Sequence, residues 1–345
     1  MNIHLRKFSN SDQLMFLEFL MRLFTITLAG IAVPVFYVIS GYLLFNKSGD
    51  NYSLDIYYHQ VKKRIGSLVI PYLLWNLIVY LLLYVLAPFV KVTMGTAEPS
   101  LMQDSYHKFW AIFNITGVPP DGPLYFIRNL FILVLFSPAI YFLLKQFKIV
   151  FVFSIAVLWL FVDIPTDNPL YSYLKALPFF TVGAFVGIKK PPLKWLYKNS
   201  KLIISSFVFC IIIDSLFALG IIDNGIIQTF NNVGYYNEIN QFSFRLSNYI
   251  GVLAAFCLAE IISFRKRRYE SLNSSVFFIY SFHVVVIAIC MLVGGFFVFP
   301  IDSVTTYLLV YLFITATCII VSIILYYLCN RFIPRISLIL SGNRK

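Results

Sequence analysis

Long apolar runs separated by short polar connections extend from residue 24 almost to the C-terminus. A helix needs about 20 apolar residues to cross the hydrocarbon core of a bilayer, and most of these runs have about that length. We therefore predict an all-α, polytopic transmembrane helical bundle of about nine spans, forming a single domain over residues 1–345. The predicted spans are 24–45, 68–90, 123–144, 148–163, 172–189, 201–222, 242–263, 275–299 and 304–331.

The composition supports the membrane class. Of the 345 residues, 60% are hydrophobic and 12% are charged, whereas a soluble domain usually carries about a quarter charged residues. The five cysteines lie inside apolar runs and lack the spacing of metal ligands, so we predict no metal site.

The basic residues indicate which connections face the cytoplasm. Five stretches hold 19 of the 27 Lys and Arg residues, namely 46–67, 145–148, 189–201, 264–274 and 331–345. The connections between them hold only Lys91 and Lys108. Because cytoplasmic connections of membrane proteins are enriched in Lys and Arg, the five basic stretches are predicted to be cytoplasmic. The net charge of +12 therefore reflects topology, and we predict no nucleic-acid partner.

This orientation places residues 1–23 on the outer side of the membrane. No signal peptide precedes them, because a basic segment followed by an apolar segment and a cleavage site is absent. We therefore expect a further span upstream of Met1.

Three stretches carry a family resemblance. They read GIAVPVFYVISGYLLF at 30–45, KKRIGSLVIPYLLW at 62–75 and PLYFIRNLFILVLFS at 123–137. In this order and spacing they resemble the membrane acyltransferase-3 family, which includes bacterial glycan and exopolysaccharide O-acetyltransferases. FFTVGAFVG at 179–187 and FFIYSFH at 277–283 fit the same family.

The resemblance implies a bundle of about ten helices and a reactive histidine about thirty residues before the VP-x-F stretch. His4 precedes Val33 by 29 residues and matches that histidine. It would act as a general base or as a transient acyl carrier, and the residues leave both roles open. The implied donor is acyl-CoA, with acetyl-CoA expected. The implied acceptor is a hydroxyl of a cell-surface or lipid-linked glycan, and the implied location is the bacterial cytoplasmic membrane.

Four cations fall near the outer ends of predicted spans, where positive charge is disfavoured. They are Arg22, Arg128, Lys175 and Arg245. A charged side chain in hydrocarbon costs about 2.5–3.5 kcal/mol on insertion scales. Our hypothesis is that some of them face one polar cavity and bind anionic groups, such as the phosphates of CoA or an acidic or phosphorylated acceptor. The alternative is that each extends to the outer lipid headgroups.

Three further residues are candidates for substrate binding. Arg64, at a cytoplasmic edge, is placed to meet CoA phosphates or to act as an ordinary basic flank. Ser40 precedes Gly41 in a stretch that lies near the reaction chamber in the family, although small residues also allow close helix packing. His283 either belongs to the site or forms a hydrogen bond between helices. The segment 101–122 is a candidate lid or acceptor platform.

Two other functions fit the same residues. One is a transporter or flippase of a lipid-linked or anionic saccharide, which would use the cations as a substrate site. The other is an inactive, truncated acyltransferase. Dependence on acyl-CoA and on His4 separates the enzyme from both. Membrane lipid is an expected partner, and the residues do not specify the oligomeric state.

Overall fold

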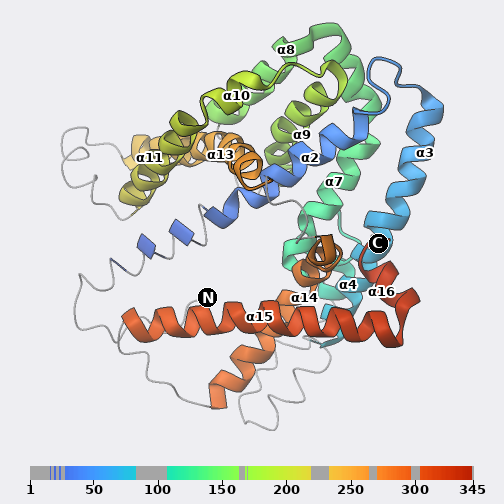
Figure 1. Cartoon of the computed structure of the whole chain (residues 1–345), viewed down its shortest axis with the longest axis vertical. Coiled ribbons are helices and arrows are strands. Elements are labelled where there is room, and N and C mark those ends of the chain that lie inside the picture. Colours follow the sequence, from blue (N-terminus) through green and yellow to red (C-terminus); the bar gives the residue numbers. More distant parts are fainter. Residues whose placement is uncertain are drawn as a thin grey trace. The chain divides into compact units, whose positions relative to one another are not determined.

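The computed structural model describes residues 28–82, 107–162, 170–218, 233–263, 270–296 and 304–343, together with positions 16, 19–20, 23–24 and 168 (Figure 1). Within these residues the secondary structure is helical and contains no strand. The prediction of an all-α bundle is therefore confirmed, and every predicted span overlaps a helix.

The chain divides into two compact units, and each unit is assembled from two separate parts of the sequence. Unit 1 comprises residues 1–57 and 136–266, and unit 2 comprises residues 58–135 and 267–345. The prediction that residues 1–345 form one domain stays a prediction.

Unit 1 contains the helices at the middle of the sequence. They are α2 (Ala32–Phe45), α8 (Ser137–Phe161), α9 (Tyr171–Lys189), α10 (Lys194–Lys198), α11 (Ser200–Ala218) and α13 (Val233–Ser263). In this unit α2 packs along α9, α11 packs along α13, and α8 packs against α9.

Unit 2 contains most of α3 and the helices near the C-terminus. Its elements are α3 (Leu54–Arg64), the π-helical turn η3 (Ile65–Val69), α4 (Ile70–Tyr80), the 3₁₀ turn η5 (Gly122–Leu124), α7 (Tyr125–Leu135), α14 (Glu270–Phe296), α15 (Val304–Phe332) and α16 (Pro334–Leu340).

Four helices of the described residues are long and apolar enough to cross a membrane, judged by length and composition. They are Ser137–Phe161, Tyr171–Lys189, Gln241–Ile262 and Val304–Phe332. Shorter apolar helices lie at Ala32–Phe45, Gly122–Leu135 and Ser275–Cys290. These segments are those of an integral membrane protein.

The helix that contains the start of the second predicted span begins before the span does. We predicted 68–90, but the helix begins at Leu54 and continues through η3 into α4. Residues 54–64 are too polar to register as a span, yet they contain no helix breaker. Pro71 occupies the first turn of α4 and lacks an N–H group, and the wider π turn at Ile65–Val69 accommodates it.

Lys148 separates the third and fourth predicted spans. It lies within α8 with φ 51° and ψ −129°, which interrupts the helical geometry at that point. This break coincides with the predicted cytoplasmic connection 145–148. The apolar residues before and after it therefore form two separate helical segments, as the sequence predicted.

Glycines allow α2 and α9 to pack closely. A Cβ atom added to Gly183 would lie 1.9 Å from the backbone oxygen of Val38, and one added to Gly41 would lie 2.2 Å from the oxygen of Phe180. Gly187, one turn beyond Gly183, approaches α2 in the same way, since its Cβ would lie 2.7 Å from the oxygen of Tyr42. This arrangement of small residues one turn apart is common where membrane helices contact each other.

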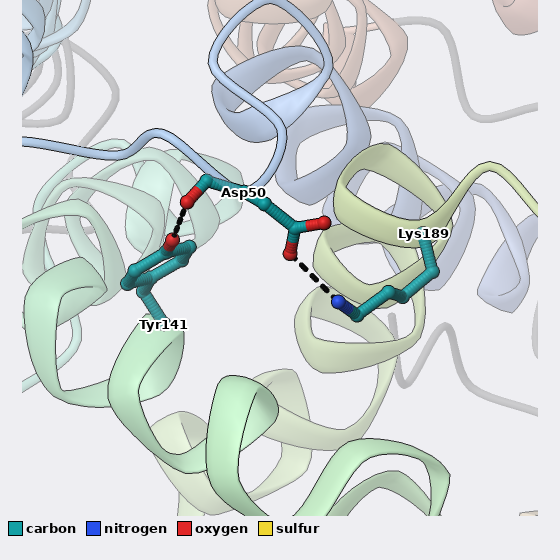
Figure 2. A network of polar contacts seen from close by, with 3 residues as sticks. All are labelled: Asp50, Tyr141 and Lys189. Carbon is teal, nitrogen blue, oxygen red and sulfur yellow. Dashed lines mark hydrogen bonds and ion pairs between the residues drawn. The ribbon is translucent and has the colours of Figure 1, made fainter.

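The connection after α2 is held to α8 and α9 by polar contacts, shown in Figure 2. Lys189 Nζ lies 2.6 Å from Asp50 Oδ1, and the Tyr141 hydroxyl donates a hydrogen bond to the backbone oxygen of Asp50. Tyr52 and Ser137 share a hydrogen bond of 2.8 Å. The first part of the predicted cytoplasmic connection, residues 46–57, is therefore joined to unit 1 by side-chain contacts.

In unit 2, Trp75 links α4 to the C-terminal helix. Its indole Nε1 donates a hydrogen bond of 3.0 Å to the backbone oxygen of Leu340, and its ring contacts Phe278 and Phe282 of α14. The segment before α7 packs on α4, because the hydroxyl of Tyr72 in α4 donates a hydrogen bond to the backbone oxygen of Ile112. These contacts build the surroundings of the candidate site.

Candidate functional site

A buried polar cluster in unit 2 surrounds Asp121, at the entry to α7. The Asn76 side chain, from α4, accepts a hydrogen bond of 2.9 Å from the backbone N–H of Asp121. The Tyr280 hydroxyl, from α14, donates a hydrogen bond of 2.7 Å to the backbone oxygen of Pro123. Tyr280 also interacts electrostatically with Asp121 and Tyr125. We call these four residues, Asn76, Asp121, Tyr125 and Tyr280, the Asp121 cluster.

The carboxyl group of Asp121 is the unusual member of the cluster. The residue is 0% exposed, and neither carboxyl oxygen accepts a hydrogen bond from any residue that the structure describes. Burial of an ionised carboxylate without partners is costly, so the neutral form is favoured. Burial accordingly raises the pKa of Asp121 from 3.8 to about 8. At neutral pH the protonated form of this acid is therefore favoured, and the ionised form becomes the major one only above about pH 8.

Arg128 lies one turn along α7 from the cluster and holds the preceding loop. Its guanidinium Nη1 donates to the backbone oxygens of Asn114, at 3.0 Å, and Gly117, at 2.5 Å. Arg128 also lines a cavity of about 280 Å³ between η3, the start of α4, the loop and α7. The remaining lining is mostly apolar and includes Leu68, Tyr72, Ile112 and Phe131.

His283 lies on α14 in the same unit, three residues after Tyr280. Its Nδ1 forms a hydrogen bond with the backbone oxygen of Tyr280. Because a carbonyl oxygen only accepts hydrogen bonds, Nδ1 carries the proton in this contact, and neutral His283 presents Nε2 as an acceptor. This hydrogen bond lies within α14, so Nδ1 does not form the hydrogen bond between helices that was the predicted alternative.

Arg245 and Lys175 are neighbours in unit 1. Arg245 Nη1 donates to the backbone oxygens of Trp159 and Val162, at 3.1 and 2.9 Å, and its guanidinium lies 4.8 Å from the centre of the Trp159 ring. Lys175 interacts electrostatically with Arg245, and its Nζ lies 5.8 Å from the centre of the Phe244 ring. Arg245 therefore caps the C-terminal end of α8, which gives its buried charge a structural function.

Arg64 and Ser40 occupy different environments. Arg64 is the last residue of α3, half-buried, and burial lowers its pKa. No carboxylate pairs with it among the residues that the structure describes. Ser40 is half-buried on α2, beside the close contact of Gly41 with α9. That position agrees with the packing interpretation of the Ser-Gly pair.

The predicted site residues thus fall into two groups. Arg128 and His283 lie in unit 2 with the Asp121 cluster, and Lys175 lies beside Arg245 in unit 1. His4 and Arg22 lie outside the described residues. Whether any of these residues binds substrate stays a prediction.

The sequence analysis did not identify Asn76 or Asp121 as site residues. Asp121 was noted only as part of the candidate lid or acceptor platform over residues 101–122. A useful signal was present, since the acid lies two residues before the family stretch that begins at Pro123. Its burial depends on packing by distant helices and is not visible in the sequence.

Comparisons with known proteins agree with the resemblance noted in the sequence. The chain is 20% identical over 232 residues to the succinoglycan biosynthesis protein ExoH of Rhizobium meliloti (strain 1021), an alignment that covers 67% of this chain. The aligned region spans 58% of that relative's length. No solved structure matches the chain. The profile of the family described as "Acyltransferase domain" matches residues 3–327. Because that match covers most of the sequence, the chain belongs to this acyltransferase family.

Proposed function

We propose that this protein transfers an acyl group, expected to be acetyl, from acyl-CoA to a hydroxyl of an exopolysaccharide or of its lipid-linked precursor. The observation that carries the proposal is the family match over residues 3–327. The similarity to a succinoglycan biosynthesis protein supports a glycan acceptor. The apolar helices support action within a membrane, which we take to be the bacterial cytoplasmic membrane.

The reaction requires a base and a binding site for the donor. The acceptor oxygen attacks the thioester carbon, the C–S bond breaks, and the hydroxyl proton passes to a base. We assign His4 as this base or as a transient acyl carrier, because imidazole gains and loses a proton near neutral pH. The leaving CoA thiolate then takes a proton from the base or from water.

Arg64 is the proposed contact for the donor. Its guanidinium is half-buried at the junction of α3 and η3, in a predicted cytoplasmic connection where CoA is available. Arginine binds phosphate through two parallel N–H groups. Its lack of a carboxylate partner within the described part of the chain is consistent with an anionic ligand. Arg128 and His283 in unit 2, and Ser40, Lys175 and Arg245 in unit 1, are further proposed substrate-binding residues.

The first test measures transfer of labelled acetyl from acetyl-CoA to the glycan and lipid fractions of membranes that contain this chain. We expect transfer by the wild type and its loss in His4→Ala, whereas His59→Ala, at an exposed position on α3, should retain it. Equal transfer by the His4→Ala and wild-type proteins would remove His4 from the mechanism. No acyl-CoA-dependent transfer by properly inserted wild type would reject the function.

The second test addresses donor binding. Arg64→Ala should raise KM for acetyl-CoA by about tenfold or more, because a charge-assisted hydrogen bond contributes about 1.5–3 kcal/mol. The exposed neighbour Lys63 provides the control, and Lys63→Ala should leave this KM nearly unchanged. If both substitutions raise KM equally, Arg64 contributes only to the general basic charge of the connection.

A further inference from the structure

Asp121 is a buried ionisable group to which neither the resemblance nor the proposed mechanism assigns a role. Its two carboxyl oxygens are inaccessible and accept no hydrogen bond from the described residues. A carboxyl group that served only to shape the loop would be expected to accept hydrogen bonds from nearby N–H groups, as buried polar groups usually do. A buried acid without partners is instead typical of a site that handles protons.

The backbone around Asp121 is fixed while its carboxyl group is left unbonded. Asn76 accepts from the Asp121 N–H, and Asn76 Nδ2 itself donates to the backbone oxygen of Tyr72 at 2.8 Å. Tyr280 fixes the chain two residues further on through the oxygen of Pro123. The position of Asp121 is thus set by α4 and α14, while its buried carboxyl oxygens accept no hydrogen bond from the described residues.

A cavity lies one helical turn along α4 from Asn76. Tyr72 lines the cavity of about 280 Å³, and Asn76, which holds Asp121, follows Tyr72 by one turn on the same helix. Residues at i and i+4 lie on the same face of a helix, so the cavity and the Asp121 backbone occupy successive turns of one face of α4. The loop that Arg128 holds forms one wall of this cavity. Because Asp121 is fully buried, a shift of this loop is required before a substrate reaches its carboxyl group.

We propose that Asp121 is the group that accepts the proton of the acceptor hydroxyl during acyl transfer. This inference rests on the proposed function. In the step, the hydroxyl oxygen bonds to the acyl carbon, and the bond from that carbon to its carrier atom breaks. That atom is a nitrogen of acylated His4, which retains the electron pair, so this step uses His4 in the second of its two proposed roles, as the transient acyl carrier. The hydroxyl proton moves to the Asp121 carboxylate, which later releases it to water.

The electrostatic surroundings suit this role. Among the described residues, the phenol of Tyr280 from α14 interacts electrostatically with Asp121, and α4 contributes the neutral side chain of Asn76. No cation in the part of the chain that the structure describes forms an ion pair with the Asp121 carboxylate. Burial raises the pKa of Asp121 to about 8, and a base is most effective when its pKa lies near the working pH.

The test compares Asp121→Asn with the wild type in the acetyl-transfer assay. The amide keeps the shape of the side chain but does not accept a proton, so we expect transfer to fall by about 100-fold or more. The melting temperature should not fall, because a buried ionisable group is removed. Asp121→Glu, which keeps the carboxyl group, should retain more transfer than the Asn variant.

The outcomes separate this inference from the proposed function. If the wild type is active and Asp121→Asn is equally active, the proposed role of Asp121 is wrong, but the proposed function still stands. Inactive wild type would overturn the proposed function and this inference with it. If the Asn variant fails to insert, the pH profile of the wild type decides. A rate that rises with pH to a plateau above about 8 supports the role, and a rate independent of pH between about 6 and 9 overturns it.

Discussion

The Asn76 side chain holds the backbone of Asp121 through a hydrogen bond of 2.9 Å, although the two residues are 45 positions apart in the sequence. Both residues are completely buried. Asn76 Nδ2 also donates a hydrogen bond to the backbone oxygen of Tyr72, so both the oxygen and the nitrogen of the side-chain amide are hydrogen-bonded. This arrangement fixes the entry to α7 against α4 within unit 2.

Asn76→Ala should destabilise the protein and reduce acetyl transfer. The substitution leaves the buried Asp121 N–H without an acceptor, which costs about 1–3 kcal/mol. The control is Asn199→Ala, because Asn199 is exposed and its amide donates only to a carbonyl of its own helical turn. Thermal unfolding in detergent should show a clear drop in Tm for the first variant and little change for the second. Equal Tm values would show that the Asn76 contact does not stabilise the fold.

The stability of the protein should decrease as pH rises, owing to Asp121. The folded-state pKa of about 8 exceeds the ordinary value of 3.8, so the folded state retains a proton that the unfolded state releases. The stabilising contribution is therefore complete below about pH 4 and is lost as pH rises toward and through 8. Asp121→Asn removes this dependence, so its Tm advantage over the wild type should grow from pH 5 to pH 9.

Asp55→Asn, an exposed acid on α3, is the control for that measurement. Its Tm difference from the wild type should be small and similar at each pH. An Asp121→Asn difference that stays constant with pH would contradict burial of the neutral acid.

Gly183→Ala should strongly destabilise unit 1. The added Cβ would lie 1.9 Å from the Val38 oxygen, so α2 and α9 must separate. Overpacking of this kind costs about 1–3 kcal/mol or more. Gly30→Ala introduces the same methyl group where no atom lies within 4 Å and should be neutral or slightly stabilising. The yield of monodisperse protein in detergent and its Tm distinguish the two, and similar values for both variants would argue against the close crossing.

Arg245→Met should lower Tm by removing the cap on α8. The backbone oxygens of Trp159 and Val162 would lose their donor, at a cost of about 1–3 kcal/mol for each buried acceptor. Arg335→Met makes the same chemical change at an exposed position and should have little effect. If acetyl transfer falls while Tm is unchanged, Arg245 acts on the substrate and its capping role is minor.

Lys148→Gly should stabilise the protein. The residue has a φ of 51° and a ψ of −129°, a sparsely populated region of backbone conformation that costs a non-glycine residue about 1–3 kcal/mol. Lys145→Gly, three residues earlier in a regular helical turn, should instead destabilise by about 0.5–1 kcal/mol. A rise in Tm for Lys148→Gly together with a fall for Lys145→Gly would verify the break at Lys148. A fall in Tm for both variants would contradict it.

The sequence alone determined the class of the protein. Hydropathy predicted spans that all overlap helices, and the basic connection 145–148 marked the break at Lys148. The stretches beginning at Gly30, Lys62 and Pro123 indicated the family that the profile match then established. These properties are local, because the length and periodicity of an apolar run are read along the chain without knowledge of its neighbours.

Only the tertiary structure decided which polar groups meet and how they are satisfied. Arg128, Lys175 and Arg245 share one pattern in the sequence, a cation near an outer helix end. Packing gives them different partners, since Arg128 holds a loop and Arg245 caps α8. Asp121 resembles a turn residue in the sequence, and burial by α4 and α14 makes it an acid without partners. The reason is physical: burial and hydrogen bonding depend on residues far away in the chain, which only the packed helices bring together.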